Sequence, residues 1–329
     1  MPFLWPKMRF VMLVLFPRHS LTIVLIQYKT NHDSVATTVM LPQNIIKGDG
    51  VVFVKCVFQR FWHTTVRFVG GELDVETTYC GSDKELAARM LVDTDTFTVR
   101  RAWWEIYRAP GYDSPHRFEI KALEGMKAYF GCGKDLNNAL EPQGISEARD
   151  LFAEGVRGVV QAETFLWQYR GFSDAKEYEN YWYELFDSGC RYYSNTDRVS
   201  RSWYEHVGYS ERNGALFNRF KNQALYLDQN TWLLKGHFVD SFHSVALEME
   251  LEKNSGKVLK AKGEILRAPD RVCMEAASFA TNLEQKQLPD MSKKEIAQIL
   301  GSENGCVHLI DLAADGANTL SLYTQQSQA

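Results

Sequence analysis

The chain has no surplus of basic residues and no basic run. Its 37 Lys and Arg are outnumbered by 41 Asp and Glu, which gives a formal net charge of −4. Proteins that bind nucleic acid by neutralising phosphates carry clustered positive charge. The composition therefore predicts no nucleic-acid partner.

No apolar run is long enough to span a membrane. The most apolar stretch, residues 9–28, is interrupted at its centre by Pro17, Arg18 and His19, whereas a spanning helix needs about 20 apolar residues. No small-residue cleavage site follows. Strand-like segments, or an extension upstream of a natural start at Met40, explain this stretch better. We favour an N-terminal extension over residues 1–50 and expect no membrane role.

The six cysteines form no C-x-x-C pair, which is typical of a reduced cytosolic protein with buried thiols. The chain also lacks a Gly-rich phosphate loop, a dinucleotide fingerprint, a G-x-S-x-G elbow and an H-E-x-x-H helix. Nucleotide-dependent enzymes, serine hydrolases and zincin proteases are thus disfavoured. We expect a cytoplasmic protein with cofactor-free or metal-assisted chemistry, or with simple binding.

What the chain does have is an internal repeat. Two segments align without a gap, residues 87–110 and 246–269, and a Gly-Cys step follows each, at Gly131 and at Gly305. The identical pairs are Ala87 and Ala246, Met90 and Met249, Val99 and Val258, Ala102 and Ala261, Glu105 and Glu264, Ile106 and Ile265, Arg108 and Arg267, Ala109 and Ala268, and Pro110 and Pro269. Two related units predict two similar half-structures that face each other across a cleft.

After residue 50, the first and last parts of the chain have the composition of strands, and the part between them has the periodicity of helices. Residues 51–58, 63–69 and 72–79 are rich in β-branched and aromatic residues. The apolar face formed by Phe152, Val156, Val159, Ala162, Leu166 and Tyr169 indicates a long helix. Further helices are expected at 174–187, 196–207, 212–228, 292–300 and 306–318, with a disordered tail after Leu322.

This order predicts an α+β fold. We expect a first β-rich unit over residues 51–143, a helical block over 144–234 and a second β-rich unit over 235–329. Each β-rich unit alone has few strands, so the two antiparallel units should share a core within one compact domain.

The second unit contains a set of thiols and imidazoles that the first unit lacks. His243, Cys273, Cys306 and His308 suit a transition metal, Zn²⁺ or Fe²⁺. In the repeat alignment His243 corresponds to Lys84, and His308 to Lys134. Two other interpretations stay open: buried structural cysteines, and a Cys306 nucleophile activated at a helix start beside His308.

The helical block offers a different candidate site. Residues 181–209 interleave aromatic side chains with charged ones, a composition typical of pockets for flat, partly apolar ligands and also of helix–sheet interfaces. We expect Tyr193, Arg198 and Trp203 to hold a substrate. Asp197, Glu205 and His206 would move protons.

The second unit also resembles a bacterial family of unknown function. Members of that family show a histidine before a hairpin, a proline and a cysteine after it, and a Gly-Cys-Thr-His-Leu motif. Here these features are His243, Pro269, Cys273 and residues 305–309, with Val307 in place of the threonine. The resemblance covers roughly residues 52–143 and 235–322. It implies a bacterial cytoplasmic protein and no particular activity.

The leading hypothesis is an enzyme that acts on a small aromatic or apolar molecule without a nucleotide cofactor, by lyase, isomerase or hydrolase chemistry. The alternatives are a metal-binding protein that uses the four residues of the second unit, and a non-enzymatic binding or scaffold protein. The expected partner is a small-molecule ligand, and homo-oligomer formation is left open.

Overall fold

The computed structural model describes residues 24–29, 34–39, 45–47, 50–52, 54–143, 145, 148–208, 211–212, 214–228 and 230–328. The chain divides into two units, Met1–Val54 and Lys55–Ala329. In the first unit β1 (Val24–Lys29) pairs with β2 (Ser34–Val39), and β3 (Ile45–Lys47) pairs with β4 (Gly50–Val52), both antiparallel. The rest of the N-terminal extension expected over residues 1–50 lies outside the described residues.

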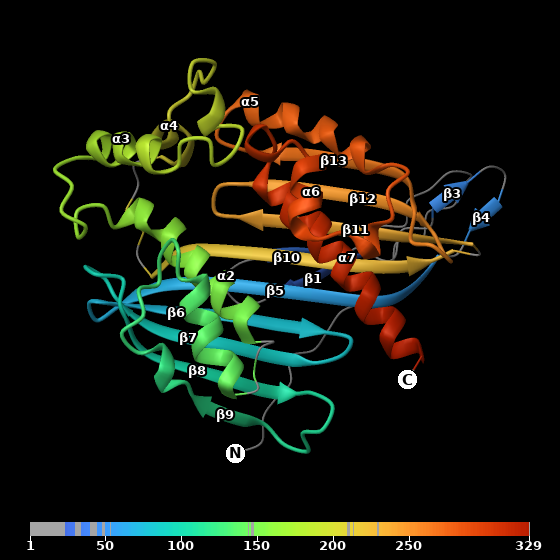
Figure 1. Cartoon of the computed structure of the whole chain (residues 1–329), viewed down its shortest axis with the longest axis horizontal. Coiled ribbons are helices and arrows are strands. Elements are labelled where there is room, and N and C mark those ends of the chain that lie inside the picture. Colours follow the sequence, from blue (N-terminus) through green and yellow to red (C-terminus); the bar gives the residue numbers. More distant parts are fainter. Residues whose placement is uncertain are drawn as a thin grey trace. The chain divides into compact units, whose positions relative to one another are not determined.

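The unit formed by Lys55–Ala329 is built on a nine-stranded antiparallel sheet (Figure 1). Its strands are β5 (Lys55–Val69), β6 (Glu72–Gly81), β7 (Glu85–Asp93), β8 (Val99–Arg108), β9 (His116–Glu119), β10 (Ala215–Leu227), β11 (Thr231–Asp240), β12 (Ser244–Glu252) and β13 (Val258–Arg267). Their order across the sheet is β13-β12-β11-β10-β5-β6-β7-β8-β9. Two meanders therefore meet along their first strands, β5 and β10.

The two meanders follow the same strand pattern. β7 and β12 begin at Glu85 and Ser244, 159 positions apart, and β8 and β13 begin at Val99 and Val258, the same distance apart. A bulge follows Glu85 in one meander and Ser244 in the other. The repeated sequence segments thus form equivalent hairpins. Their origin by duplication stays a prediction.

Helices cover one face of the sheet (Figure 1). They are α1 (Gly133–Leu140), α2 (Ala148–Ala162), α3 (Ala175–Leu185), α4 (Trp203–Val207), α5 (Arg271–Met274), α6 (Lys293–Ile299) and α7 (Val307–Gln328), with short 3₁₀ turns between them. Helix α2 packs on β5, β6, β7 and β10, and α7 packs on β10, β11, β12 and β5. Strands with helices on one face confirm the α+β class.

The Gly-Cys steps are not structurally equivalent, contrary to the sequence alignment. Cys132 precedes α1, whereas Cys306 precedes α7. The helix that takes the place of α7 on the first meander is α2, and the two begin at Ala148 and Val307, again 159 positions apart. By this structural offset His308 corresponds to Arg149 and not to Lys134. By the same offset α1 corresponds to α6 (Lys293–Ile299), so the alignment failed because the first Gly-Cys step precedes this helix whereas the second follows it.

Two clusters of buried apolar side chains form the core, with a polar centre between the helices that cover them. One cluster joins the first meander to α1 and α2, and the other joins the second meander to α6 and α7. Glu154 on α2 and Asp315 on α7 both accept a hydrogen bond from Lys221 on β10. Strand β10 therefore connects the two helices through buried charge.

Several expected elements differ from the observed ones. Residues 212–228 were expected to be helical, but most of this segment is strand β10. Only 203–207 of the expected helix 196–207 is α-helical, and the long helix from Phe152 ends at Ala162. Helix α7 runs on to Gln328, so the expectation of a disordered tail after Leu322 is wrong. The expected helices 174–187 and 292–300 correspond to α3 and α6.

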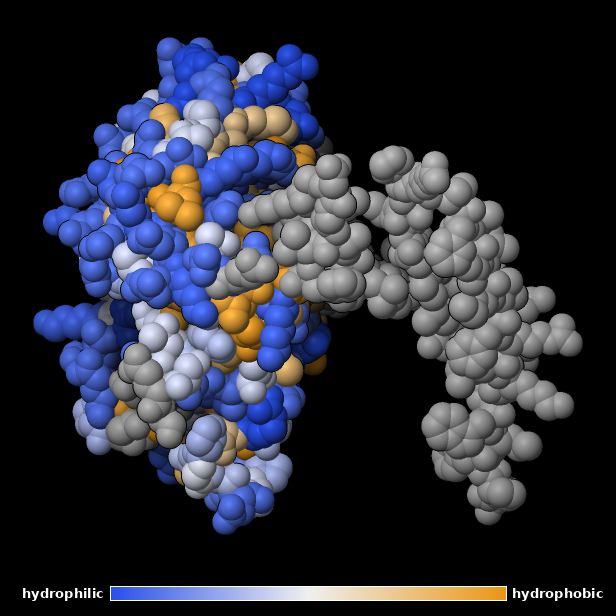
Figure 2. Space-filling view, turned by 90° about the vertical axis from the view of Figure 1, so that its right-hand side faces the viewer, coloured by the Kyte–Doolittle hydropathy of each residue, from blue (hydrophilic) through white to orange (hydrophobic). Residues whose placement is uncertain are grey.

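The surface shown in Figure 2 is mostly hydrophilic, and its hydrophobic residues lie in small separate patches. Among the residues that the structure describes, none of the helices combines the length and the apolar character that a membrane crossing requires.

Candidate functional site

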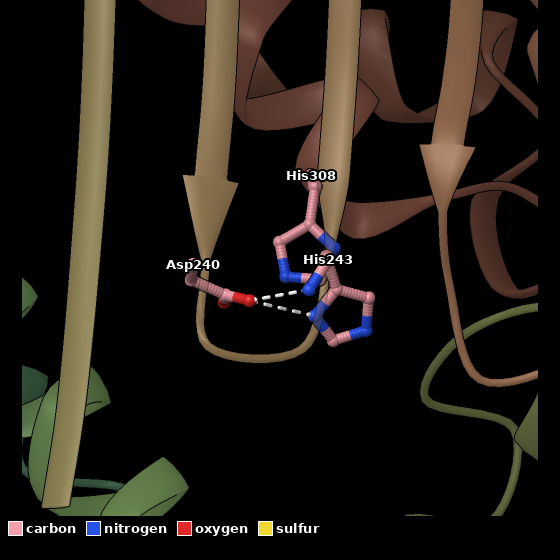
Figure 3. Close-up of side chains that lie close together, drawn as sticks. All are labelled: Asp240, His243 and His308. Carbon is pink, nitrogen blue, oxygen red and sulfur yellow. Dashed lines mark hydrogen bonds and ion pairs between the residues drawn. The ribbon is translucent and has the colours of Figure 1, made fainter. Parts of the chain in front are cut away.

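A tight turn between β11 and β12 places Asp240 and His243 together (Figure 3). Asp240 ends β11, and its Oδ1 accepts hydrogen bonds from the backbone N–H groups of Phe242 at 2.8 Å and His243 at 2.7 Å. An aspartate that accepts from the backbone two and three residues further on is a common way to fix a turn. The same oxygen lies 3.1 Å from Nδ1 of His243. The carboxylate thus fixes both the turn and the imidazole.

Arg219 on β10 supports the carboxylate from its other side. Its Nη2 donates to Oδ2 of Asp240 over 3.3 Å, and both side chains are buried. Burial alone would raise the pKa of Asp240, but the charge and hydrogen bond of His243 and the charge of Arg219 hold that pKa well below its usual range. Asp240 is therefore ionised at neutral pH.

The first turn of α7 brings His308 to the same place. The centroid of its ring lies 4.2 Å from that of His243 and 4.3 Å from that of Phe238. Burial, together with the neighbouring His243, lowers the pKa of His308 to about 3. Potential ligand atoms of Asp240, His243 and His308 lie within 4.8 Å of one another, and no other such group occurs in the described part of the chain.

A glycine is required where α7 begins. A Cβ on Gly305 would overlap the carbonyl oxygen of Leu300, a backbone atom that cannot move aside alone. This close approach ends the turn after α6 and lets α7 start beside β11 and β12. The Gly305-Cys306 step thus positions His308.

His243, His308 and Arg219 line a cavity of about 700 Å³, whereas Asp240 is buried behind its wall. The cavity wall also contains a group of aromatic side chains from α3, α4 and the segment between them: Tyr178, Trp182, Phe186, Tyr192, Tyr193 and Trp203. A cavity of this size, mostly apolar and with a few convergent polar groups, is the usual form of a small-molecule site.

Two buried donors on the cavity wall lack hydrogen-bond partners. They are Nε of Arg219 and Nε1 of Trp182, and neither finds an acceptor among the described residues. Buried N–H groups in folded proteins are nearly always paired. Both atoms have almost no accessible surface, so a ligand in the cavity could reach them only after neighbouring side chains moved.

Polar contacts hold the segment between α3 and α4 to the start of α5 and to the turn that precedes α7. Arg191 donates from Nε to the carbonyl of Val272 at 2.8 Å and from Nη1 to that of Asn304 at 3.0 Å. Asp270 accepts from the backbone N–H groups of Ser200 and Arg201, both at 3.0 Å. These bonds hold the aromatic wall against the side of the cavity that carries His243.

The four residues predicted to bind a metal all line this cavity. His243 and His308 belong to the close cluster, but Cys273 and Cys306 do not, and Asp240 completes it instead. Cys306 lies near the cluster, with Sγ 3.9 Å from Nδ1 of His308. The structure thus brings together half of the predicted set.

The thiols have the environment of structural cysteines. Burial raises the pKa of Cys273 and of Cys306 to about 12 in each case. Thiolate is the nucleophilic form. Cys306 does lie beside His308 at the start of α7, as the nucleophile interpretation expects, but its raised pKa disfavours the thiolate.

The residues predicted to move protons lie outside the cavity wall. Asp197 is exposed. Glu205 is exposed and forms the capping box of α4 with Ser202. His206 contacts the Phe242 carbonyl through Nε2 at 2.8 Å and Arg201 through Nδ1 at 3.0 Å. These contacts explain Glu205 and His206 as residues that stabilise α4 and its neighbours.

The residues predicted to hold a substrate are divided between the cavity wall and the protein surface. Tyr193 and Trp203 line the cavity, whereas Arg198 is exposed and forms an ion pair with Glu275 at 2.6 Å. The prediction of an aromatic wall therefore agrees with the structure better than the prediction of an arginine clamp.

Sequence reasoning missed the roles of Asp240 and Arg219. An aspartate three residues before a histidine, between two strand-like segments, was the available signal for Asp240, because this spacing suits a side chain that closes a turn. The spacing of residues gave no comparable signal for Arg219, which lies in the segment interpreted as a helix.

Residues 220–321 match the family described as Protein of unknown function (DUF2889). The match spans less than a third of the chain and contains Asp240, His243 and His308. No significant match was found among curated proteins or among solved structures.

Proposed function

We propose that this protein is an enzyme that acts on a small aromatic or otherwise apolar molecule, with its reactive centre at Asp240, His243 and His308. One observation carries the proposal: two imidazoles, His243 and His308, meet on the wall of a cavity of about 700 Å³, and the buried carboxylate of Asp240 lies beside them. Titratable groups that meet in an otherwise apolar cavity are the usual mark of a catalytic site.

The chemistry that this centre favours is proton movement at the reacting atom. Lyase, isomerase and hydrolase reactions all require it. A carboxylate and two imidazoles in close contact can accept and donate a proton, directly or through water held by a bound ion. The pKa of about 3 makes His308 neutral at physiological pH.

The cavity wall supports the choice of substrate class. Trp203 and Tyr193 come from the segment that the sequence indicated, and Tyr178 and Trp182 from α3 adjoin it. Aromatic side chains with polar edges suit flat ligands that also carry a polar atom.

The cellular compartment and the origin by duplication that the sequence predicts belong to the same proposal. The cysteines are all free, Cys56 and Cys80 being exposed, which supports a reducing compartment such as the bacterial cytoplasm. The matching strand bounds and bulges of the two meanders support an origin by duplication, with the reactive centre in the second copy only.

A ligand screen tests this function. Aromatic acids, phenols and aromatic ketones would be added to the full chain, and thermal unfolding would be followed; a ligand at 100 times its Kd stabilises by about 2.7 kcal/mol. Ala153, on α2 and on the cavity wall, offers a matched pair of variants. Ala153→Trp fills the cavity and should abolish the stabilisation, whereas Ala153→Gly should keep it.

Turnover separates an enzyme from a binding protein. Any compound that binds would be incubated with wild-type protein and with His243→Gln, and product formation would be followed by chromatography. Conversion by the wild type alone supports the proposal. Binding that Ala153→Trp leaves intact, or the absence of binding by every class of compound, would refute it.

A further inference from the structure

We infer that Asp240, His243 and His308 bind a divalent first-row transition-metal ion. This inference deepens the proposed function, on which it rests only for the role of the ion in a reaction. The metal set expected from the sequence is thereby changed: Asp240 takes the place of Cys273 and Cys306.

The geometry of the three side chains carries the inference. They come from the end of β11, the start of β12 and the first turn of α7, and they point toward one another (Figure 3). Their potential ligand atoms all lie within 4.8 Å of one another, and Oδ1 of Asp240 lies 3.1 Å from Nδ1 of His243. Atoms bound to one ion at about 2.0–2.2 Å are themselves separated by distances of this order.

The donor set selects the kind of ion. Two imidazoles and one carboxylate suit Fe²⁺, Zn²⁺ and their neighbours in the first row, whereas Ca²⁺ and Mg²⁺ prefer oxygen ligands throughout. Binding requires the neutral imidazoles. For His243 to bind through Nδ1, that nitrogen must carry no proton, so coordination would replace the hydrogen bond to Asp240.

Neighbouring groups already hold the ligands in place. Nη2 of Arg219 and the backbone N–H groups of Phe242 and His243 fix the Asp240 carboxylate. Packing against Phe238 fixes the ring of His308. Such outer contacts orient the ligands of metal sites and raise their affinity.

The cluster also leaves room for chemistry. His243 and His308 line the cavity, so an ion with three protein ligands would have coordination positions for water or substrate. Three protein ligands with open positions are typical of catalytic metal sites, whereas structural sites use four.

Metal titration of the full chain tests the inference. Protein dialysed against EDTA would be titrated with Zn²⁺ by calorimetry and with Co²⁺ by absorption spectroscopy. We expect about one equivalent bound per chain and weak Co²⁺ d–d bands without a thiolate-to-metal charge-transfer band. His308→Gln and His243→Gln should each weaken metal binding by about 100-fold or more, because loss of a residue that only orients a ligand already weakens binding by about 10- to 100-fold.

Matched variants make the outcome decisive. His237 is exposed and lies on the same strand as Asp240, so His237→Gln should leave affinity unchanged. Cys273→Ser with Cys306→Ser should also keep it. Circular dichroism would show that each variant is folded, and Asp240→Glu, which retains the carboxylate, gives a second measure if Asp240→Asn unfolds.

Three results would overturn the inference. These are less than about a tenth of an equivalent of bound metal, equal loss in the His237 and His308 variants, or a strong thiolate band that the cysteine substitutions remove. The proposed function fails separately. Metal binding without any aromatic ligand refutes that function alone. Ligand conversion by a protein that binds no metal refutes the metal site alone.

Discussion

At the scale of single residues, Glu154 shares with Asp240 and Asp315 the task of balancing the buried positive charge at the centre of the sheet. Its Oε1 accepts from Nζ of Lys221 and from Nη1 of Arg157, both at 2.7 Å, and its Oε2 accepts from Nη1 of Arg219 at 3.3 Å. Although burial would raise the pKa of Glu154, the three cations hold it well below the usual range.

We expect Glu154→Gln to lower the free energy of unfolding by about 3–5 kcal/mol. The amide would leave Lys221 and Arg219 buried with too little negative charge beside them. Urea denaturation at pH 7 measures the change. Glu184→Gln, an exposed substitution on α3, should change stability by less than about 0.5 kcal/mol. A similarly small effect at Glu154 would contradict this account of the centre.

The contribution of Glu154 should also depend on pH. Its pKa in the folded protein lies below the value in the unfolded chain, so its stabilisation is complete above the unfolded value of about 4.3 and declines as the pH falls below it. The stability difference between wild type and Glu154→Gln should therefore be constant from pH 7 to pH 5 and smaller at pH 3. Urea denaturation at the three pH values provides the test, and a difference that grows toward pH 3 would show the wrong sign.

Residue chemistry predicted part of the site. His243 and His308 could be identified because an unmatched imidazole in one repeat is visible by alignment. Asp240 and Arg219 could not, because their role depends on a turn and on a neighbouring strand that bring them to the same point. Asp197 and Glu205 were predicted to lie in the cavity because they alternate with aromatic residues along the sequence. In the structure only some of those aromatic residues face the cavity, and the two carboxylates do not.

At the scale of elements, the start of α7 couples folding to the reactive centre. We expect Gly305→Ala to destabilise the protein by about 1–3 kcal/mol, because the new Cβ meets the Leu300 carbonyl and displaces the first turn. The displacement should also move His308 and weaken Zn²⁺ binding. Urea denaturation and calorimetry measure the two effects.

Gly133→Ala provides the control for this substitution. Gly133 opens α1, and a Cβ there meets only Nη2 of Arg149 at 4.0 Å. Alanine should therefore be neutral or slightly stabilising at this position. If Gly305→Ala behaved in the same way, the close approach at the start of α7 would not be what positions His308.

Strand β10 shows why some elements could not be predicted from the sequence. Its inward side chains include Arg219, Lys221 and Gln223, all buried, beside apolar Phe217 and Leu225. Polar residues on the buried face remove the alternation that identifies a strand, and the remaining apolar residues fit a helical spacing. The repeated hairpins, whose buried residues are mostly apolar, were identified correctly.

At the scale of the whole molecule, the pairing of β5 with β10 makes one sheet from two meanders. Both α2 and α7 contact these two strands. We therefore expect residues 55–329 to unfold in one cooperative step, with the amides of β5 and β10 among the slowest to exchange with deuterium and those of the exposed edge strand β9 among the fastest. Hydrogen exchange read by mass spectrometry tests this, and separate unfolding of the two meanders would contradict it.

The contacts that close the aromatic side of the cavity have a kinetic consequence. Arg191 and Arg198 both pair with Glu275, and Arg198 and Glu275 are about half exposed. Attraction between exposed charges weakens as salt is added. If molecules enter and leave past this wall, their residence time in the protein should shorten as ionic strength rises, even where the equilibrium contacts with the aromatic rings stay the same.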